Sequence, residues 1–397
     1  MRSPSIRLGH QPALDGLRAV AIVLVVLEHT GDLLIADDPP GFSGGPFMPG
    51  GFLGVDLFFV LSGFLITTLL LEERADRGRV GLLAFYERRA LRLLPALGVL
   101  LVSTTVWVAA AGDGLRNHLR GVAGAAAYVS NWLLSASVDT GDFGLGHLWS
   151  LAVEEQFYLA WPILLTVVLF VARTPRSVVA ACVVIAVLAA VQRSRVADSA
   201  GVLDAYVRTD TRADGLLIGG ALAVARSLCG FAPRWSRHLV LPGLCVIVTL
   251  AATTAFTDAW LYDGGFFVVA VVSGTVVCGA ITGTSRTTRV LASRPLQRVG
   301  SYSYTAYLLH FPVFQAVGDR LSDAGPWARI GFAWAISLVA ITACHRWVEQ
   351  PFLDLKERRS DARSRSRSRH AQLERELVPE QGGPARDADP IDRTGRP

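Results

Sequence analysis

The sequence predicts an all-α integral membrane protein, a polytopic bundle of about ten transmembrane helices. Hydrophobic residues make up 51% of the 397 residues, and the mean hydropathy is +0.41. Only 18% of the residues are charged, below the roughly 25% of a soluble domain. Apolar stretches long enough to cross a bilayer recur along most of the chain, and arginines gather between them.

Eleven apolar segments have the length expected of a membrane-spanning helix. They cover residues 13–35, 52–71, 91–111, 121–137, 147–172, 177–192, 212–227, 239–257, 265–283, 300–318 and 327–349.

The charge of the connecting loops predicts how many of these segments cross. The arginine-rich connections are 73–89, 225–238, 284–298 and the tail after residue 350, whereas 36–51, 257–264 and 319–326 are nearly free of positive charge. The positive-inside rule places the first group and both termini in the cytoplasm of a cell-membrane protein. An even number of spans must then separate Arg89 from Arg226. Five candidates lie there, so one should not cross, and we expect it to be the Gly- and Ala-rich segment 121–137 with Asn131 at its middle.

The chain divides into two expected regions. Residues 1–353 should form one membrane domain, and residues 354–397 a disordered, arginine-rich cytoplasmic tail. Arg-Ser repeats allow contact with RNA or with anionic lipid; behind a membrane domain we favour lipid and expect no nucleic-acid partner. The N-terminus shows no signal-cleavage pattern, so the first helix should stay in the mature protein. The five cysteines lack paired spacing, and we expect neither disulfides nor a metal site.

The first segment carries an arginine near one end and a Glu-His pair near the other. Ionisable groups inside a bilayer are costly and usually mark a pathway or a reaction site. Arg18 and His29 are about three helical turns apart, so they lie on nearly one face, roughly 16 Å from each other. The alternative is a snorkelling arginine and a histidine bonded to a neighbouring helix.

The predicted orientation brings polar residues of several spans to one depth in the outer half of the membrane. Offsets of three, four and seven residues place those of segment 147–172 on one helix face. The residues are Glu28 and His29 in the first segment, Asp56 in the second, His147, Ser150 and Glu154 in segment 147–172, and Arg212 and Asp214 in segment 212–227.

Three arginines lie within five residues on the predicted cytoplasmic side: Arg88, Arg89 and Arg92. Planar guanidinium groups in such a cluster suit a phosphate group, as on a cytosolic nucleotide. The alternative is ordinary anchoring of the helix end by positive charge.

Several motifs occur in a fixed order along the chain. They are Leu14-Asp15-Gly16-Leu17-Arg18-Ala19 with His29, the run 54–64, Arg88-Arg89-x-x-Arg92-x-x-Pro95, the run 147–158, Arg212-Ala213-Asp214-Gly215, the run 301–312 with His310, and Glu349-Gln350-Pro351-Phe352. In order and spacing they resemble the acyltransferase family 3 membrane proteins, which are integral-membrane O-acyltransferases of bacterial surface glycans and of some secondary metabolites. The resemblance covers about residues 12 to 353.

The resemblance implies a ten-span enzyme that uses cytosolic acyl-CoA, usually acetyl-CoA, as co-substrate without a permanently bound cofactor. The acceptor would be a hydroxyl group of a carbohydrate, a glycolipid or a secondary metabolite. Arg18 and His29 match the family's arginine–histidine pair, with the histidine essential, and Arg88, Arg89 and Arg92 match its second arginine motif, associated with the donor. Some members carry a further hydrolase-like domain that this sequence lacks, so we expect a stand-alone transferase.

The chemistry expected of these residues agrees with that implication. Attack of a hydroxyl on a thioester needs a base and donors that hold the developing oxyanion. His29 is the best base, because its unperturbed pKa lies near neutrality. Either Glu154 or Asp56 would orient it, and the sequence leaves the choice open. Supporting roles are expected for Glu28, His147, Ser150, Arg212, Asp214 and His310.

Two questions stay open at this level. Either the acyl group passes down a channel to an acceptor at the outer face, or His29 is transiently acylated. A polytopic glycan or lipid transporter is the alternative function, since it would also have intramembrane charge and a basic cytoplasmic face. A non-catalytic receptor or scaffold is a weaker alternative.

Overall fold

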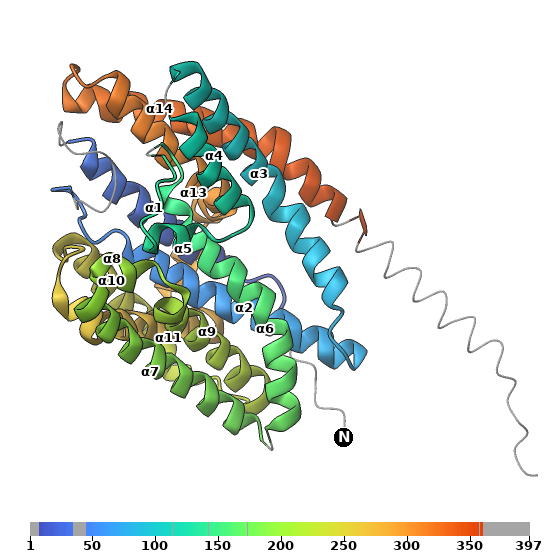
Figure 1. Cartoon of the computed structure of the whole chain (residues 1–397). Coiled ribbons are helices and arrows are strands. Elements are labelled where there is room, and N and C mark those ends of the chain that lie inside the picture. The colour runs from blue at the N-terminus through green and yellow to red at the C-terminus, as the bar shows by residue number, and fades with distance from the viewer. Residues whose placement is uncertain are drawn as a thin grey trace, which may run out of the picture.

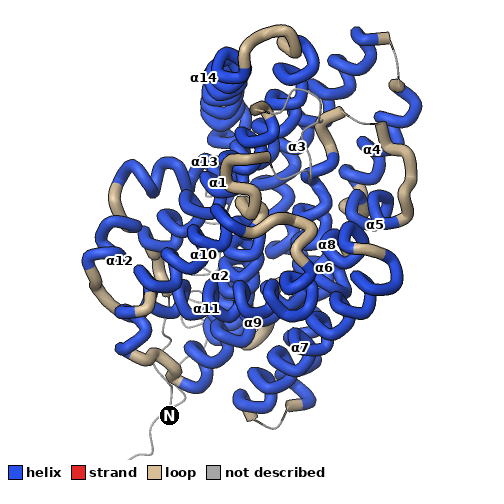
Figure 2. The backbone as a smooth tube through the Cα atoms, turned by 90° about the vertical axis from the view of Figure 1, so that its left-hand side faces the viewer, coloured by secondary structure: helices blue, strands red, loops and turns tan. Residues whose placement is uncertain are grey.

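A computed structural model describes residues 8–34, 45–112, 114–141, 143–172, 174–356 and 358–359. Within these ranges the chain forms helices and loops and no strand (Figure 2). The α-helices are α1 (Pro12–Asp32), α2 (Leu53–Arg77), α3 (Leu82–Ala111), α4 (Leu115–Ala126), α5 (Ser130–Ser135), α6 (Trp149–Val171), α7 (Pro175–Ala200), α8 (Val202–Val207), α9 (Thr209–Cys229), α10 (Val240–Thr253), α11 (Phe266–Thr282), α12 (Arg286–Leu291), α13 (Arg294–Arg320) and α14 (Pro326–Cys344). Short 3₁₀ or π turns lie at Gly146–Leu148 (η1), Arg234–His238 (η2), Leu261–Gly265 (η3) and His345–Glu349 (η4).

Six helices of the described chain are long and apolar enough to cross a membrane. They cover Leu53–Arg77, Leu82–Ala111, Gly146–Val171, Pro175–Ala200, Leu261–Thr282 and Pro326–Lys356. This confirms the all-α membrane class. Four more predicted segments form α1, α9, α10 and α13, so a total of ten spans stays a prediction. Segment 121–137 forms α4 and α5, of 12 and 6 residues, which are shorter than the roughly 20 residues that a crossing needs.

The helices form two groups with α1 and α2 between them (Figure 1). One group holds α7, α9, α10 and α11, and the other holds α3, α4, α13 and α14. Within this arrangement α9 packs chiefly against α2 and α7, and α1 packs chiefly against α13. The pair α1 and α2 thus links both groups and lies at the centre of the molecule.

Glycines allow the central helices to approach closely. A Cβ atom on Gly63 of α2 would lie 1.9 Å from the carbonyl oxygen of Leu216 in α9, and one on Gly219 would lie 2.1 Å from that of Val60. A Cβ atom on Gly300 of α13 would lie 2.0 Å from the carbonyl oxygen of Asp15 in α1. Small residues at such crossings are typical of helices that pack in a bilayer.

The C-terminal end of the described chain remains helical. Residues 351–356 and 358–359 are helical, and the Arg359 guanidinium donates to Glu87 of α3 at 2.9 Å. The rest of the predicted tail, from residue 360, lies outside the described residues.

Candidate active site

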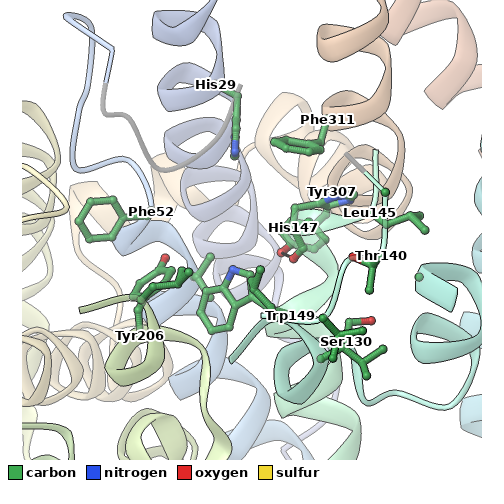
Figure 3. Close-up of a pocket in the computed structure, with 18 of the residues that line it drawn as sticks. His29, Phe52, Ser130, Thr140, Leu145, His147, Trp149, Tyr206, Tyr307 and Phe311 are labelled. Carbon is green, nitrogen blue, oxygen red and sulfur yellow. Dashed lines mark hydrogen bonds between the residues drawn. The ribbon is translucent and has the colours of Figure 1, made fainter. Parts of the chain in front are cut away.

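A cavity of about 420 Å³ lies where α1, α2, α8 and α13 meet the segment that runs from α4 to the start of α6 (Figure 3). In Figure 3, His29 and Phe311 lie on one side of this cavity, and Trp149 and Tyr206 on the opposite side. Its polar wall residues include Glu28, His29, Ser130, Asp139, Thr140, His147 and Tyr307. The volume is in the range that takes a small ligand.

His29 is held by its own helix and by α13. Its Nδ1 lies 2.9 Å from the carbonyl oxygen of Val25 and 3.4 Å from Nε2 of His310. Nδ1 of His310 lies 2.8 Å from the carbonyl oxygen of Ala306. A carbonyl only accepts, so each histidine carries its hydrogen on Nδ1, and Nε2 of His310 accepts from His29. Nε2 of His29 therefore keeps its lone pair and can take a proton.

This arrangement corrects the expectation that Glu154 or Asp56 orients His29. The orienting groups in the structure are a backbone carbonyl and a second histidine. Both carboxylates bond elsewhere, because other donors lie closer to them in the packed bundle.

His147 lies on the same side of the cavity. Its ring centroid is 5.8 Å from that of His310 and 4.9 Å from that of Phe311, which is in turn 5.0 Å from that of His29. His147 is 5% exposed, and neither of its ring nitrogens makes a hydrogen bond within the described residues. The structure thus brings His29, His147 and His310 together.

Ser150 joins this site through Tyr307. The Tyr307 hydroxyl donates a short hydrogen bond to the carbonyl oxygen of His147, so the Ser150 hydroxyl donates to Tyr307, at 2.5 Å. Tyr307 also lies within electrostatic reach of Glu28 and Glu154. Tyr307 therefore lies between the cavity and a second part of the site, which contains Arg18, Arg89 and Arg92.

Glu154 belongs to this second, arginine-containing part of the site. Its carboxylate accepts from the Ser62 hydroxyl at 2.9 Å and from the Tyr158 hydroxyl at 3.5 Å. It lies within electrostatic reach of Arg18 and Arg89. Glu154 is not part of the cavity wall, so it lies on the side of Arg18 and Arg89 rather than beside His29.

Arg18, Arg89 and Arg92 converge, because Arg92 lies within electrostatic reach of both other guanidinium groups. Arg89 donates to Glu155 at 2.7 Å, and its guanidinium lies 3.5 Å from the centre of the Tyr158 ring. Three cations in one place repel each other unless anions join them. The cluster is therefore suited to an anionic ligand.

Arg88 is not part of this cluster. It donates to Glu73 of α2 at 3.1 Å, beside the ion pair of Glu73 with Arg77. One helical step separates Arg88 from Arg89, and that step turns its side chain toward α2 instead of the other two arginines.

Asp56, Arg212 and Asp214 form a buried ion-pair network directly behind the cavity wall, where the Arg212 guanidinium lies 5.1 Å from the centre of the Tyr206 ring. Arg212 donates to Asp56 at 2.8 Å, and Arg193 donates to Asp214 at 2.8 Å and to the carbonyl oxygen of Thr211 at 2.8 Å. Both arginines are 0% exposed. The network joins α2, α7 and α9, and its place in the structure indicates a structural role for these three predicted site residues.

Sequence reasoning missed Arg193 and the aromatic wall residues. The predicted segment 177–192 ends one residue before Arg193, although α7 continues to Ala200. The signal that could have identified Arg193 is a cation within a continuous apolar helix. Tyr206, Phe52 and Phe311 gave no distinctive signal, because aromatic residues are common throughout apolar helices.

Comparisons with known proteins give a consistent result. Residues 11–345 match the family model described as "Acyltransferase domain". The chain is 33% identical over 325 residues to "O-acetyltransferase OatA" of Staphylococcus aureus, covering 78% of this chain and 51% of that protein. It is 32% identical over 362 residues to "Putative peptidoglycan O-acetyltransferase YrhL" of Bacillus subtilis, covering 86% and 54%. It is 33% identical over 360 residues to "Peptidoglycan O-acetyltransferase OatA" of Listeria monocytogenes, covering 86% and 55%.

The chain thus spans about half the length of these relatives. No solved structure shows significant similarity to it.

Proposed function

Because the chain belongs to the acyltransferase family whose domain model it matches over residues 11–345, we propose that it is a membrane-bound O-acyltransferase. It transfers an acyl group, typically acetyl, from cytosolic acyl-CoA to a hydroxyl group of a carbohydrate, a glycolipid or a secondary metabolite. Two of the relatives are named for peptidoglycan, which favours a glycan hydroxyl. The observation that supports this most strongly is that Nε2 of His29, which makes no hydrogen bond within the described residues, lies at a cavity large enough for an acceptor.

The donor binds at the arginine end of α1. Arg18, Arg89 and Arg92 pair with the phosphates of CoA, which add negative charge to a cluster in which only Arg89 makes an ion pair within the described residues. Arg18 and His29 are roughly 16 Å apart along α1, so the pantetheine arm spans the gap past Glu154 and Tyr307. The thioester then reaches the cavity while the nucleotide stays at the cytoplasmic face.

The acceptor hydroxyl attacks the thioester carbon at His29. Nε2 of His29 takes the hydroxyl proton as the new carbon–oxygen bond forms. The tetrahedral oxyanion takes a hydrogen bond from the ring N–H of His147, which has no other partner in the described chain. The carbon–sulfur bond then breaks, and the departing thiolate takes the proton from His29 to leave as free CoA.

The test is acyl transfer from labelled acetyl-CoA by the full-length protein in vesicles with a glycan acceptor. His29→Gln keeps a hydrogen-bonding side chain of similar size but cannot take a proton at neutral pH. We expect its rate to fall about 10²–10⁴-fold, with unchanged amounts of membrane-inserted protein.

His118→Gln is the matched control. His118 is also buried, at 1% exposed, and lies on α4 outside the cavity wall. It should keep the activity of the original protein. A His29→Gln protein that transfers acetyl at the original rate would show that His29 is only a hydrogen-bonding group.

A further inference from the structure

Glu28 is a buried acid in the cavity wall, one residue before His29. It is 3% exposed. No hydrogen bond or ion pair reaches its carboxyl group from the described residues. The charged group that acts on it most directly is Asp32, a second acid one turn along α1. A buried carboxylate is costly unless a cation or donors reach it.

The other charged groups around the cavity do not compensate Glu28. No arginine or lysine occurs among the residues of the cavity wall, whereas a second acid, Asp139, does. Asp139 accepts from the side chain of Asn117 and from the backbone N–H of Gly141. Among the described residues the cavity wall therefore holds two acids and no arginine or lysine, and the carboxyl group of Glu28 has no partner there.

The buried cations behind the wall are already paired. Arg212 and Arg193 each hold a carboxylate, as described above. Tyr206 lies between this network and the cavity, within electrostatic reach of both Arg212 and Glu28. Neither arginine is free to neutralise Glu28.

The wall opposite His29 is aromatic. The ring centroids of Trp149 and Tyr206 are 4.4 Å apart, and those of Phe52 and Tyr206 are 5.7 Å apart (Figure 3). Aromatic faces attract cations within about 6 Å of the ring centre. On the rest of the wall, the Ser130 hydroxyl and the His147 ring nitrogens are buried without hydrogen-bond partners in the described chain, which points to a polar ligand.

Resting on the O-acyl transfer proposed above, we propose that the acceptor is a hydroxyl compound that also carries a protonated amine. Its ammonium group pairs with Glu28 beside the aromatic wall, and its hydroxyl group lies at Nε2 of His29. The ammonium supplies the missing counter-charge. It also has no lone pair, so the amine cannot compete with the hydroxyl for the acyl group.

The test compares two probes of nearly equal shape, methyl glucosaminide and methyl glucoside, which differ by an ammonium in place of a hydroxyl. Their binding to the full-length protein in nanodiscs is measured at neutral pH without acyl-CoA. A charge-assisted hydrogen bond gives an expected preference of about ten- to hundred-fold for the amine. Glu28→Gln should abolish this preference and leave binding of the neutral probe unchanged.

Asp204→Asn is the matched control. Asp204 lies on α8, which also forms part of the wall, but its carboxylate bonds Ser135 and is not part of the cavity. This variant should keep the preference for the amine.

Three results would overturn the inference: equal binding of the two probes, no binding of the amine, or a preference that survives Glu28→Gln. Other results distinguish this inference from the proposed function. Transfer from acetyl-CoA to a neutral acceptor without a preference for the amine would contradict only the inference. Binding of the amine without any acyl transfer would contradict only the proposed function.

Discussion

At the scale of single residues, one helical step separates an arginine of the cluster from an arginine that pairs with a neighbouring helix. Arg92 lies within electrostatic reach of Arg89 and Arg18, while Arg88 pairs with Glu73 of α2. The sequence places all three in one motif and predicts one role for them. Which face of α3 meets α2 is decided by packing, and that is why the sequence could not separate them.

We expect Arg89→Ala and Arg92→Ala each to raise the KM for acyl-CoA. Each substitution removes a charge-assisted contact to phosphate, worth roughly 1.5–3 kcal/mol. Arg88→Ala removes only a partly exposed ion pair and should leave that KM nearly unchanged. Initial rates against acyl-CoA concentration measure all three. An unchanged KM for the Arg89 and Arg92 variants would mean that these two arginines act only as membrane anchors.

Packing between helices also decides how the His29 ring is oriented, so the sequence could not predict that orientation. The sequence predicts the base and its distance from Arg18 along one helix. Its partner His310 is 281 residues away in the chain, and no spacing rule connects the two. The regular geometry of a single helix can be predicted from the sequence, whereas the contact between α1 and α13 cannot.

His310→Phe should lower the rate less than His29→Gln. The Val25 carbonyl still fixes the hydrogen of His29 on Nδ1, but the ring loses the contact that limits its rotation. We expect a decrease in kcat with little change in the KM for acyl-CoA, measured in the same transfer assay. An unchanged kcat, or a change confined to the KM for acyl-CoA, would contradict this positioning role of His310.

At the scale of helices, the sequence placed the apolar centres well and the charged ends poorly. α3 begins at Leu82 and α13 at Arg294, whereas the predicted segments begin at 91 and 300. The missing turns carry arginines, which lower hydropathy without interrupting the backbone hydrogen bonds of a helix. Helix ends at a membrane surface are therefore longer than hydropathy alone indicates.

The crossing of α2 and α9 should depend on its glycines. Gly63→Leu would force a side chain into the backbone of α9 and separate the two helices, so we expect a large loss of folded protein and a lower Tm in detergent. Gly98→Leu on α3 is the matched control, since a Cβ atom there meets nothing within 4 Å. Similar melting temperatures for both variants would show that α2 and α9 do not depend on close contact.

At the scale of the whole molecule, loop charge predicts the orientation in the membrane. Reporter fusions after Arg89, Arg237 and Arg359 should all report the cytoplasm, because arginine-rich loops stay on that side. A fusion after Gly50, in the poorly charged stretch before α2, should report the opposite side. An external signal from the fusion after Arg237 or Arg359 would contradict the even number of spans between the basic loops.

The family is the part of the prediction that the motifs determined best. The matching family model confirms the resemblance over residues 11–345, and the O-acyltransferase class is confirmed at the level of that family. The motif residues themselves fall into two groups in the structure. Some meet at the cavity or the arginine cluster, while Asp56, Arg212 and Asp214 form the buried network. A motif in one sequence marks both kinds of residue alike.

That buried network has a consequence for how the protein is made. Asp56 and Arg212 are 156 residues apart in the chain, so α2 leaves the ribosome long before its counter-ion exists. A lone carboxylate in hydrocarbon is costly, and α2 must hold Asp56 protonated or near the bilayer surface until α9 arrives. Arg193 and Asp214, only 21 residues apart, enter almost together as a pair. The insertion of α2 into the membrane is therefore complete only after α9 has been inserted.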